Sequence, residues 1–355
     1  MKKIAIIGIQ GVPANYGGFE SLVENIIGDD RSADICYTVF CSSKDVKELM
    51  TSYKGACLKY VPFHANGLQS VPYDIVSMMR AIRGYDTVLV LGVSGCIFLP
   101  VFRLLSRSKL VVNIDGLEHR RDKWGKIARA FLKYSEMVAV KYADVVIADN
   151  KGIQDYVKEE YDRESELIAY GGDHVIRNLS PGFEQKVLEK YSLHSGDYAI
   201  TVCRIEPENN CHKTLDAFSR TDKKLMFIGN WSRGDYGRNL KEKYSKFPNI
   251  VIQDPIYDID ILYALRKNAV MYIHGHSAGG TNPSLVEAMF FGCPILCYDV
   301  VYNRASTQGK AYYWENVDEL VDLLNRTDLC GDVMRSIAQK EYTWKAIASQ
   351  YEALY

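Results

Sequence analysis

The chain has 355 residues, and its 43 Lys and Arg nearly balance its 44 Asp and Glu, giving a formal net charge of -1. That balance argues against a dedicated nucleic-acid-binding protein, which would carry a large basic excess. The length suits two domains, and nearly half of the residues are apolar, enough to bury a core. The nine cysteines include no C-x-x-C pair, which favours buried thiols in a reducing compartment over a disulfide framework. No stretch approaches the roughly 20 apolar residues of a membrane span, so we expect a cytoplasmic protein.

Short apolar runs alternate with helical periodicity along the chain, which is typical of parallel α/β architecture. In the first half this predicts strands at 3–9, 37–40, 87–91, 109–114 and 144–148, with helices at 20–27, 73–83 and 126–141. The alternation restarts with strands at 198–203, 224–228, 250–253, 269–274 and 295–299, and helices at 214–219, 261–267, 284–291 and 344–355. Two such sets predict two Rossmann-like domains, whose ligands bind beyond the carboxyl ends of the strands.

The segment 274–289 gives the clearest indication of a ligand site. A predicted strand ends, a glycine-containing loop follows, and a helix starts with Asn282 as its cap and Pro283 at its first position. A helix start behind a glycine loop favours anions, so a diphosphate suits this loop. Glu287, about one turn into the helix, would instead accept hydrogen bonds from ribose hydroxyls. A well-capped packing helix would give the same pattern.

A second candidate is Arg204, which directly follows the predicted strand 198–203. Its forked and always charged guanidinium suits a pair of phosphates at the carboxyl end of the strand. The alternative is a surface ion pair with Glu206 or Glu208, and for Arg204 taken alone this is the more ordinary interpretation.

The glycine-rich loop 8–20 joins the first predicted strand to the first predicted helix. It fits neither the dinucleotide-binding fingerprint nor the P-loop pattern. Gly17 and Gly18, at the helix start, would let the backbone approach a donor or an acceptor, although a plain tight turn would use the same residues.

Two pairs of side chains, one acidic and one of histidines, have spacings that could suit a metal-binding site. Asp258-Ile-Asp260 has the form of a metal clamp, but Asp is also favoured as helix cap and first-turn residue, and capping is our prediction. His274 and His276 alternate on a strand without a neighbouring acidic or Cys ligand, which is weak support for a metal. We expect His276 to hydrogen-bond a ligand at the mouth of the loop, and no metal or other cofactor.

Taken together, these segments resemble glycosyltransferase family 4. Arg-Ile-Glu-Pro-Glu-Asn-Asn at 204–210 is similar to the family's Arg-Leu-x-Pro-Glu-Lys-Asn. Pro-Ser-Leu-Val-Glu-Ala-Met at 283–289 is similar to the second half of its Glu-x7-Glu motif. The segment 11–20, together with Asp-Gly-Leu-Glu at 115–118, resembles a narrower subgroup that includes rhamnosyltransferases of bacterial capsule and cell-wall polysaccharide synthesis.

The resemblance implies an α/β protein of the GT-B fold, with two Rossmann-like lobes, an interdomain cleft and a C-terminal helix that returns to the first lobe. It implies an acceptor-binding domain at 1–172, a nucleotide-sugar-binding domain at 173–340 and the returning helix at 341–355.

The subgroup implies a retaining transfer of L-rhamnose from dTDP-β-L-rhamnose to a saccharide carried on a polyprenyl diphosphate, with no nucleic-acid partner. Three alternatives remain open. They are a UDP-hexose-dependent transferase of the same family, a sugar-nucleotide epimerase of the same two-lobed build, and a non-catalytic subunit of a polysaccharide assembly complex.

Two departures from the family pattern concern residues that bind the donor. Gly279 stands where most members have the first Glu of the motif, which contacts the transferred sugar, and Asn209 stands where they have a Lys. Lys213, four residues later and on the same face if one helix spans both, is a substitute cation. The start of the helix at 282–284 and Arg204 would then stabilise the charge on the departing diphosphate.

Residue by residue, the candidate site has three groups. The catalytic candidates, which include residues that would orient the acceptor hydroxyl, are Arg204, Asp115 and His119. The donor-binding candidates are Gly17, Gly18, Arg204, Asn209, Lys213, Tyr257, His276, Gly279, Gly280, Thr281, Asn282, Pro283, Ser284, Leu285 and Glu287. The acceptor-binding candidates are Glu118, Arg120 and Arg121.

A basic, aromatic tract covers 119–134, where apolar residues recur at helical spacing among Lys and Arg. Such a surface would lie on anionic lipid, or its apolar stripe would pack on the first domain as in any amphipathic helix. A lipid-linked acceptor favours the first interpretation, and with it peripheral association with the inner face of the cell membrane.

Overall fold

The computed structural model describes residues 1–14, 17–28, 32–121 and 124–355. The chain divides into two compact units, an N-terminal unit of Met1–Tyr170 with Trp344–Tyr355 and a C-terminal unit of Gly171–Thr343. The sequence prediction had divided the chain after residues 172 and 340. Each unit is a parallel α/β unit and the last helix belongs to the first one, so the predicted fold class is confirmed.

The sheet of the N-terminal unit has the strand order β3-β4-β2-β1-β5-β6-β7-β8, and only β3 runs antiparallel to its neighbour. Its strands are β1 (Lys2–Ile7), β2 (Ile35–Ser42), β3 (Ser52–Tyr53), β4 (Ala56–Val61), β5 (Thr87–Leu91), β6 (Lys109–Asn113), β7 (Val145–Ala148) and β8 (Glu166–Leu167). The helices are α1 (Gly18–Ile26), α2 (Ser70–Arg80), α3 (Leu99–Leu105), α4 (Lys126–Tyr142), α5 (Lys151–Tyr161) and α14 (Trp344–Ala353).

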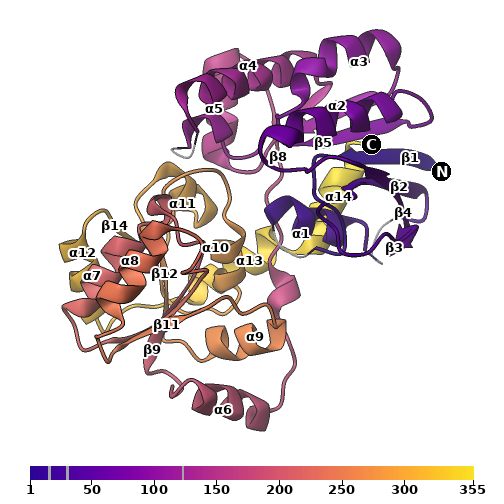
Figure 1. Ribbon diagram of the computed structural model, residues 1–355. Helices are drawn as coiled ribbons and strands as arrows, with labels where there is room; N and C mark the ends of the chain where they lie inside the picture. The colour runs from indigo at the N-terminus through magenta and orange to yellow at the C-terminus, as the bar shows by residue number, and fades with distance from the viewer. Residues whose placement is uncertain (15–16, 29–31, 122–123) are drawn as a thin grey trace. The chain divides into compact units, whose positions relative to one another are not determined.

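Helices cover both faces of this sheet. Figure 1 shows α2, α3 and α4 on one face and α1 with α14 on the other. On the second face a single core cluster joins Ile4 of β1, Leu22 of α1 and Ile347 of α14. Tyr351 of α14 also accepts a 2.9 Å hydrogen bond from Asn113 at the end of β6. The C-terminal helix is therefore an integral part of the N-terminal unit.

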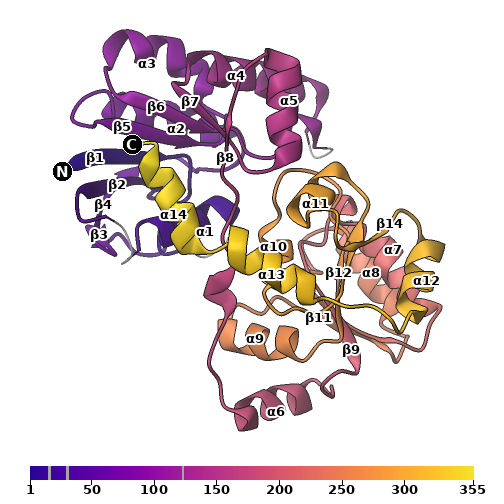
Figure 2. The same cartoon turned by 180° about the vertical axis from the view of Figure 1, so that it is seen from behind.

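The sheet of the C-terminal unit has the order β11-β10-β9-β12-β13-β14, and every neighbouring pair is parallel. Its strands are β9 (Tyr198–Val202), β10 (Lys224–Ile228), β11 (Ile250–Gln253), β12 (Met271–His274), β13 (Ile295–Tyr298) and β14 (Tyr312–Trp314). The helices are α6 (Pro181–Lys190), α7 (Cys211–Ser219), α8 (Asp235–Tyr244), α9 (Ile259–Lys267), α10 (Pro283–Met289), α11 (Val301–Ser306), α12 (Val317–Asn325) and α13 (Asp332–Glu341). In Figure 2, α7, α8 and α12 lie on one side of this sheet and α9, α10 and α13 on the other.

In both sheets, the direction in which the chain adds successive strands reverses next to the first strand. In the C-terminal unit the chain runs from β9 outward to β10 and β11, and then returns to place β12 on the other side of β9. In the N-terminal unit the corresponding reversal separates β1 from β5. Loops diverge at such a switch point, and open parallel sheets bind their ligands there, beyond the carboxyl ends of the strands.

Candidate functional site

The loops after β9 and β12 meet at the switch point of the C-terminal unit. Asn209, in the short 3-10 turn η5 (Pro207–Asn209), lies 2.6 Å from His276 Nδ1 through its Oδ1 atom. Its Nδ2 group donates to the Arg204 carbonyl at 2.7 Å, and this orients Oδ1 as the acceptor from His276. Both side chains are buried. Asn209 therefore links the Arg204 backbone to His276 through both ends of its amide group.

Neighbouring residues tie the same two loops together. Asn210 donates to the Gly275 carbonyl at 2.8 Å, and both the backbone N–H and the hydroxyl of Ser277 donate to the Glu208 carbonyl, at 2.9 and 2.8 Å. The approach is so close that a Cβ atom at Gly275 would stand 2.3 Å from the Asn209 carbonyl oxygen. Glycine is therefore required at 275, and the two loops form one continuous edge.

Arg204 extends from this edge and is held only loosely. Its guanidinium lies 3.8 Å from Glu206 and 3.7 Å from Glu208, the two carboxylates that the sequence had offered as an alternative. Both distances exceed hydrogen-bond length, and the side chain is 34% exposed. A second cation that the sequence analysis missed, Arg233, lies 3.8 Å from Glu206. Two guanidinium groups and two carboxylates thus share this corner of the sheet.

The start of α10 has the predicted capping chemistry. The Asn282 side chain accepts from the Ser284 N–H at 3.0 Å, and Pro283 occupies the first turn, so both predictions are confirmed. The N–H groups of Leu285 and Val286 donate to the Asn282 carbonyl. The N–H groups of these three residues are therefore already engaged within the start of α10 itself.

Gly279 adopts a φ of 90°, in the left-handed region that side chains disfavour. A Glu at this position, as in most of the resembled family, would be strained in this backbone. Gly280 and Thr281 complete the loop, and Thr281 is buried.

Glu287 is engaged by a residue that the sequence analysis did not single out. Arg266, in the last turn of α9, donates from Nη2 to Glu287 Oε2 at 2.6 Å and is itself only 3% exposed. His174, in the 3-10 turn η4 (Asp173–Val175), places Nε2 3.6 Å from Glu287 Oε1. Nothing local in the sequence links Arg266 to a carboxylate 21 residues away.

The predicted role of Lys213 rests on a helix that the structure interrupts. Asn210 has a φ of 48°, in the left-handed region, so Asn209 and Lys213 do not share a helix. The Lys213 ammonium donates to the Tyr298 hydroxyl at 3.1 Å and to the Glu315 carbonyl at 2.9 Å. This correction removes the geometric reason for assigning Lys213 to the diphosphate.

The predicted helix cap at Asp258 is confirmed. Its carboxylate accepts from the N–H groups of Asp260 and Ile261 at 2.9 and 3.2 Å, while Asp260 pairs with Arg177 at 2.7 Å. Tyr257, just before the cap, is 70% exposed. Across the described ranges, no group of three or more His, Cys, Asp and Glu side chains is placed to hold a metal ion.

His274, at the end of β12, is buried, and its Nε2 atom has no hydrogen-bond partner among the residues that the structure describes. Burial lowers the pKa of His274 to about 3, so the imidazole is neutral near physiological pH. It therefore supplies no positive charge to an anion.

In the N-terminal unit, Gly17 and Gly18 form the start of α1 after the loop that follows β1. Gly17 has a φ of 127°, and a Cβ atom there would stand 1.8 Å from Glu20 Oε2. The other Glu20 oxygen accepts from the Gln10 N–H at 2.9 Å. Burial raises the pKa of Glu20, against the lowering effect of the Gln10 bond. Asn15 and Tyr16 of this motif lie outside the described residues.

Asp115 and His119 follow β6 at the carboxyl edge of the same sheet. Asp115 has a φ of 61°, and its N–H donates to Asn113 Oδ1 at 3.0 Å. His119, in the 3-10 turn η3 (Glu118–Arg120), bonds through Nδ1 to Glu136 Oε2 at 3.0 Å. The Nε2 side of the imidazole is therefore the side available for proton exchange or for an acceptor hydroxyl.

Glu136 is a buried carboxylate that the sequence analysis missed. Besides His119, it accepts from the hydroxyls of Tyr156 and Tyr161 at 2.7 and 2.6 Å. Burial raises its pKa, but the hydrogen bonds from His119, Tyr161 and Tyr156 outweigh that effect and leave the pKa below its usual value. A charged Glu136 thus fixes the orientation of His119.

The predicted acceptor-binding residues already have protein partners. Glu118 accepts from the Trp124 indole at 3.0 Å and lies 2.9 Å from the Arg121 guanidinium. Arg120 is exposed and stacks over the Tyr156 ring at 4.7 Å. Only Arg120 of these three presents its charge openly to solvent.

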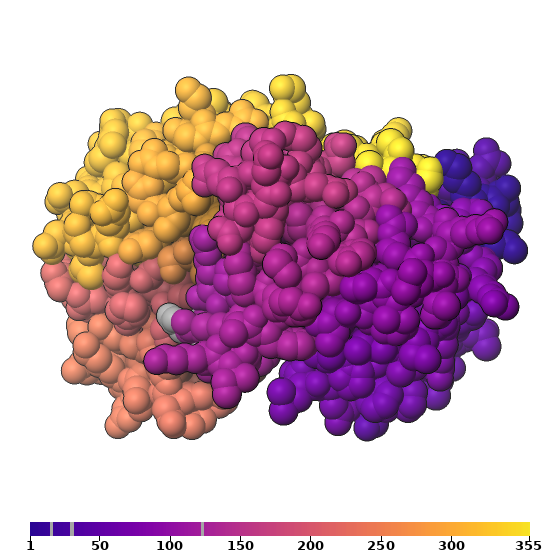
Figure 3. All heavy atoms as spheres, turned by 90° about the horizontal axis from the view of Figure 1, so that it is seen from above, coloured from indigo at the N-terminus to yellow at the C-terminus, as the bar shows by residue number. Residues whose placement is uncertain are grey.

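The last part of the basic tract, from residue 126, lies in α4, and its exposed apolar side chains are outside the buried face of that helix. Ile127 is 88% exposed and Tyr134 56% exposed, whereas Trp124 and Phe131 are half-buried. The buried face of α4 instead comprises Leu132, Ser135, Glu136, Val138, Ala139 and Val140. Figure 3 looks down on the layer that includes α4 and α5, in magenta. Asp122 and Lys123 of the tract lie outside the described residues, and in the described part no helix is long and apolar enough to cross a membrane.

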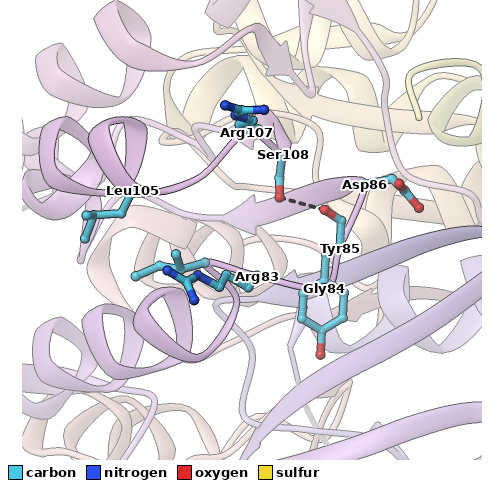
Figure 4. A pocket seen from close by; sticks show the side chains of 8 residues that line it. Arg83, Gly84, Tyr85, Asp86, Leu105, Arg107 and Ser108 are labelled. Carbon is cyan, nitrogen blue, oxygen red and sulfur yellow. Dashed lines mark hydrogen bonds between the residues drawn. The ribbon is translucent and has the colours of Figure 1, made fainter.

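An open cavity of about 490 Å³ lies elsewhere in the N-terminal unit, where the α2–β5 and α3–β6 connections meet. Arg83, Arg107 and Leu105 line it, and the Ser108 hydroxyl donates to the Tyr85 carbonyl at 2.7 Å (Figure 4). These connections lead into the amino ends of the strands. The cavity is therefore at the edge opposite the candidate residues and contains none of them.

Comparison with known proteins supports the fold. Residues 1–173 match the family described as a domain of unknown function, DUF1972. No curated protein matches the chain in sequence. Among solved structures, sucrose-phosphate synthase from Thermosynechococcus elongatus superposes with a TM-score of 0.81 at 14% identity, covering 100% of this chain and 98% of that chain.

Two further structures are similar over their whole length. Anabaena HepE in complex with UDP-glucose gives a TM-score of 0.78 at 14% identity, with 100% of this chain and 99% of that chain covered. A glycosyltransferase from Rickettsia africae gives 0.76 at 15% identity, with 99% and 97% covered. At these identities the likeness establishes the fold that the three proteins share with this chain.

Proposed function

We propose that this chain is a glycosyltransferase that takes its sugar from a nucleotide-diphosphate donor bound at the joined loops after β9 and β12. The observation that carries the proposal is the link from the Arg204 backbone through Asn209 to His276, which holds the imidazole of His276 next to the backbone that carries the Arg204 guanidinium. Similarity to HepE, solved with UDP-glucose, supports the same class of donor.

Arg204 and Arg233 are the proposed partners of the diphosphate. Their contacts to Glu206 are ion pairs of 3.8 Å, which a phosphate oxygen can replace with a shorter, charge-assisted hydrogen bond. Negative charge grows on the diphosphate as the sugar departs, and fixed cations aimed at developing charge are effective catalysts. Because two guanidinium groups supply that charge, we propose a transfer that needs no metal.

The donor that we propose is dTDP-β-L-rhamnose, used with retention of configuration. This rests on the resemblance of 11–20 and 115–118 to the rhamnosyltransferase subgroup. The φ of 90° at Gly279 also supports an unusual mode of sugar binding. The backbone there disfavours a Glu side chain, whose carboxylate most of the resembled family uses to contact the sugar.

The acceptor that we propose is a saccharide on a polyprenyl diphosphate, and we assign its binding to residues of the N-terminal unit. His119, oriented by Glu136, and Asp115 are proposed to position the acceptor hydroxyl. Peripheral association with an anionic membrane surface is proposed for α4, where Ile127 and Tyr134 are exposed beside the exposed Lys126.

A thermal-shift screen of nucleotide sugars on the isolated full chain tests the proposed donor. A ligand that binds only the folded state raises the melting temperature by mass action, so dTDP-rhamnose should give the largest shift. If UDP-glucose gives the largest shift, the proposed donor is wrong, but the proposal of a nucleotide-sugar-dependent glycosyltransferase stands. No shift with any nucleotide sugar, in a folded sample, would contradict the proposal.

A further inference from the structure

An exposed apolar surface lies at the ends of α2 and α3. Met79, one residue before the end of α2, is 54% exposed, and Leu104 and Leu105, the last residues of α3, are 85% and 57% exposed. Large apolar side chains that gather on the surface of a protein mark a site where a partner or a membrane binds. This end of the N-terminal unit therefore presents apolar area that the chain itself does not cover.

The open cavity of about 490 Å³ brings Arg83 and Arg107 together with Leu105 (Figure 4). Neither guanidinium has a hydrogen-bond or ion-pair partner among residues 1–14, 17–28, 32–121 and 124–355. Asp86, the carboxylate that lines the cavity, accepts a 2.7 Å hydrogen bond from the Lys3 N–H through Oδ2. The two arginines can therefore pair with an anion from outside the chain.

A second hollow adjoins this cavity through Arg83 and Leu105, and Met79 and Arg80 also line it. The stretch 79–109 carries five cations and one carboxylate, although the whole chain has a net charge of -1. We call this surface the α2–α3 patch, and it comprises Met79, Arg80, Arg83, Leu104, Leu105 and Arg107. It is both basic and apolar, the combination that binds anionic lipid surfaces.

The position of the leucines favours a bilayer over a soluble anion. A free phosphate would pair with Arg83 and Arg107 but would leave Leu104 in water. A bilayer offers both partners at once, with phosphates at the level of the head groups and acyl chains just below them. Arginine keeps its charge at the head-group level while neighbouring apolar side chains enter the acyl layer.

Helix α4 belongs to the same layer of helices. Arg103 of α3 donates from Nε to the Tyr142 carbonyl at the end of α4 at 2.9 Å, and Figure 1 shows α2, α3 and α4 on one face of the sheet. Outside the buried face of α4, Met137 is 40% exposed and Lys141 is exposed. The α2–α3 patch and the exposed side chains of α4 are therefore parts of one helical layer.

We propose that the α2–α3 patch docks the protein on an anionic phospholipid bilayer, with Arg83 and Arg107 on lipid phosphates and Leu104 and Leu105 among the acyl chains. The patch lies at the edge of the sheet opposite the candidate residues, so lipid bound there leaves those residues free. Docking at this patch requires neither a nucleotide nor an acceptor, and it does not depend on the proposed transferase activity.

Co-sedimentation of the full chain with vesicles tests the docking. The wild type should pellet with vesicles of phosphatidylcholine and phosphatidylserine and stay in the supernatant with phosphatidylcholine alone. Arg83→Gln with Arg107→Gln should lower the partition coefficient about thirtyfold, because each cation near an anionic surface contributes about fivefold to binding. Lys186→Gln with Lys223→Gln removes the same charge from exposed positions of the C-terminal unit. This matched control should bind like the wild type.

Leu104→Ser with Leu105→Ser supplies the complementary measurement. This variant should bind at least about tenfold more weakly because it loses apolar area, and it should keep the salt dependence of the wild type because it keeps the arginines. All four substitutions of the patch change exposed side chains, and circular dichroism checks that the variants fold. A folded variant of either kind that binds as tightly as the wild type overturns the proposal, as does equal binding of the wild type to neutral and anionic vesicles.

The docking and the transferase proposals fail separately. If the folded wild type pellets with neither kind of vesicle, the docking is wrong, whatever the nucleotide-sugar screen shows. A rise in melting temperature with inorganic phosphate, without vesicle binding, would assign the two arginines to a soluble anion and overturn the docking too. Arg83→Gln with Arg107→Gln should keep the nucleotide affinity of the wild type, because both positions lie away from the proposed donor site.

Discussion

Asn209 Oδ1 accepts a 2.6 Å hydrogen bond from His276 Nδ1, and this contact joins the loops that follow β9 and β12. Both partners are buried, so neither can turn to water when the other is removed. The contact decides where the imidazole stands relative to Arg204, and we therefore expect it to matter for stability and for nucleotide binding.

A double-mutant cycle of Asn209→Ala and His276→Ala measures this contact. Each single variant should lose about 1–3 kcal/mol of unfolding free energy, since each leaves a buried polar group unsatisfied. The double variant should lose less than the sum, with a coupling of about 1 kcal/mol. The control pair combines His276→Ala with Asn268→Ala, whose amide contacts Glu184 and the Ala264 carbonyl. Additivity in the Asn209 cycle would refute the link.

Arg204→Ala should weaken nucleotide-diphosphate binding at least about tenfold, because it removes a charge-assisted contact. Its effect on stability should stay below about 1 kcal/mol, as for other exposed ion pairs. Arg326→Ala, which removes an exposed pair with Asp328 in the same unit, is the control and should leave binding intact. Wild-type affinity in folded Arg204→Ala would rule out Arg204 as a phosphate partner.

Asp74 should make the stability of the N-terminal unit depend on pH. Burial raises its pKa from 3.8 to about 8, against the lowering effect of the Gly95 N–H. The folded chain therefore keeps this proton after the unfolded chain has lost it, so the stabilisation is complete below pH 3.8 and declines as pH rises toward about 8.

Asp74→Asn removes this titration while its amide oxygen still accepts from the Gly95 N–H. In urea unfolding between about pH 5 and pH 8, the wild type should lose up to about 1.4 kcal/mol per pH unit relative to the variant. Asp34→Asn, at an exposed site, is the control. Parallel pH profiles for wild type and Asp74→Asn would show that Asp74 is charged in the folded chain.

Ile127→Ser with Tyr134→Ser should weaken binding to vesicles that contain phosphatidylserine, because both side chains are exposed on the outer face of α4. Leu68→Ser, at a 90% exposed position outside α4, is the control and should leave vesicle binding unchanged. Equal co-sedimentation of all three proteins would remove α4 as the membrane-binding surface.

Local sequence chemistry predicted those features that depend on neighbouring residues. The caps at Asn282 and Asp258 follow from side chains that bond N–H groups two residues on, and the structure contains both. Long buried strands such as β1 and β5 also stood out as continuous apolar runs. Short edge strands such as β3 and β8, of two residues each, carry too little pattern to be seen.

Tertiary contacts account for what the sequence did not reveal. Arg266 meets Glu287, and Glu136 meets His119, only because the fold brings separate helices and turns together. The error at Lys213 has a local cause. Asn tolerates a left-handed backbone conformation. Because Asn210 adopts it, no single helix spans Asn209 and Lys213, as our prediction had assumed.

Transfer of sugar by the isolated chain is the most direct test of the central claim. The purified protein is mixed with dTDP-β-L-rhamnose and a polyprenyl-diphosphate-linked saccharide in the presence of EDTA, and both products are measured by mass spectrometry. The account predicts release of dTDP together with an acceptor that gains the mass of one rhamnose, and loss of both in Arg204→Ala. An acceptor left unchanged by the folded protein with every nucleotide sugar offered would contradict it.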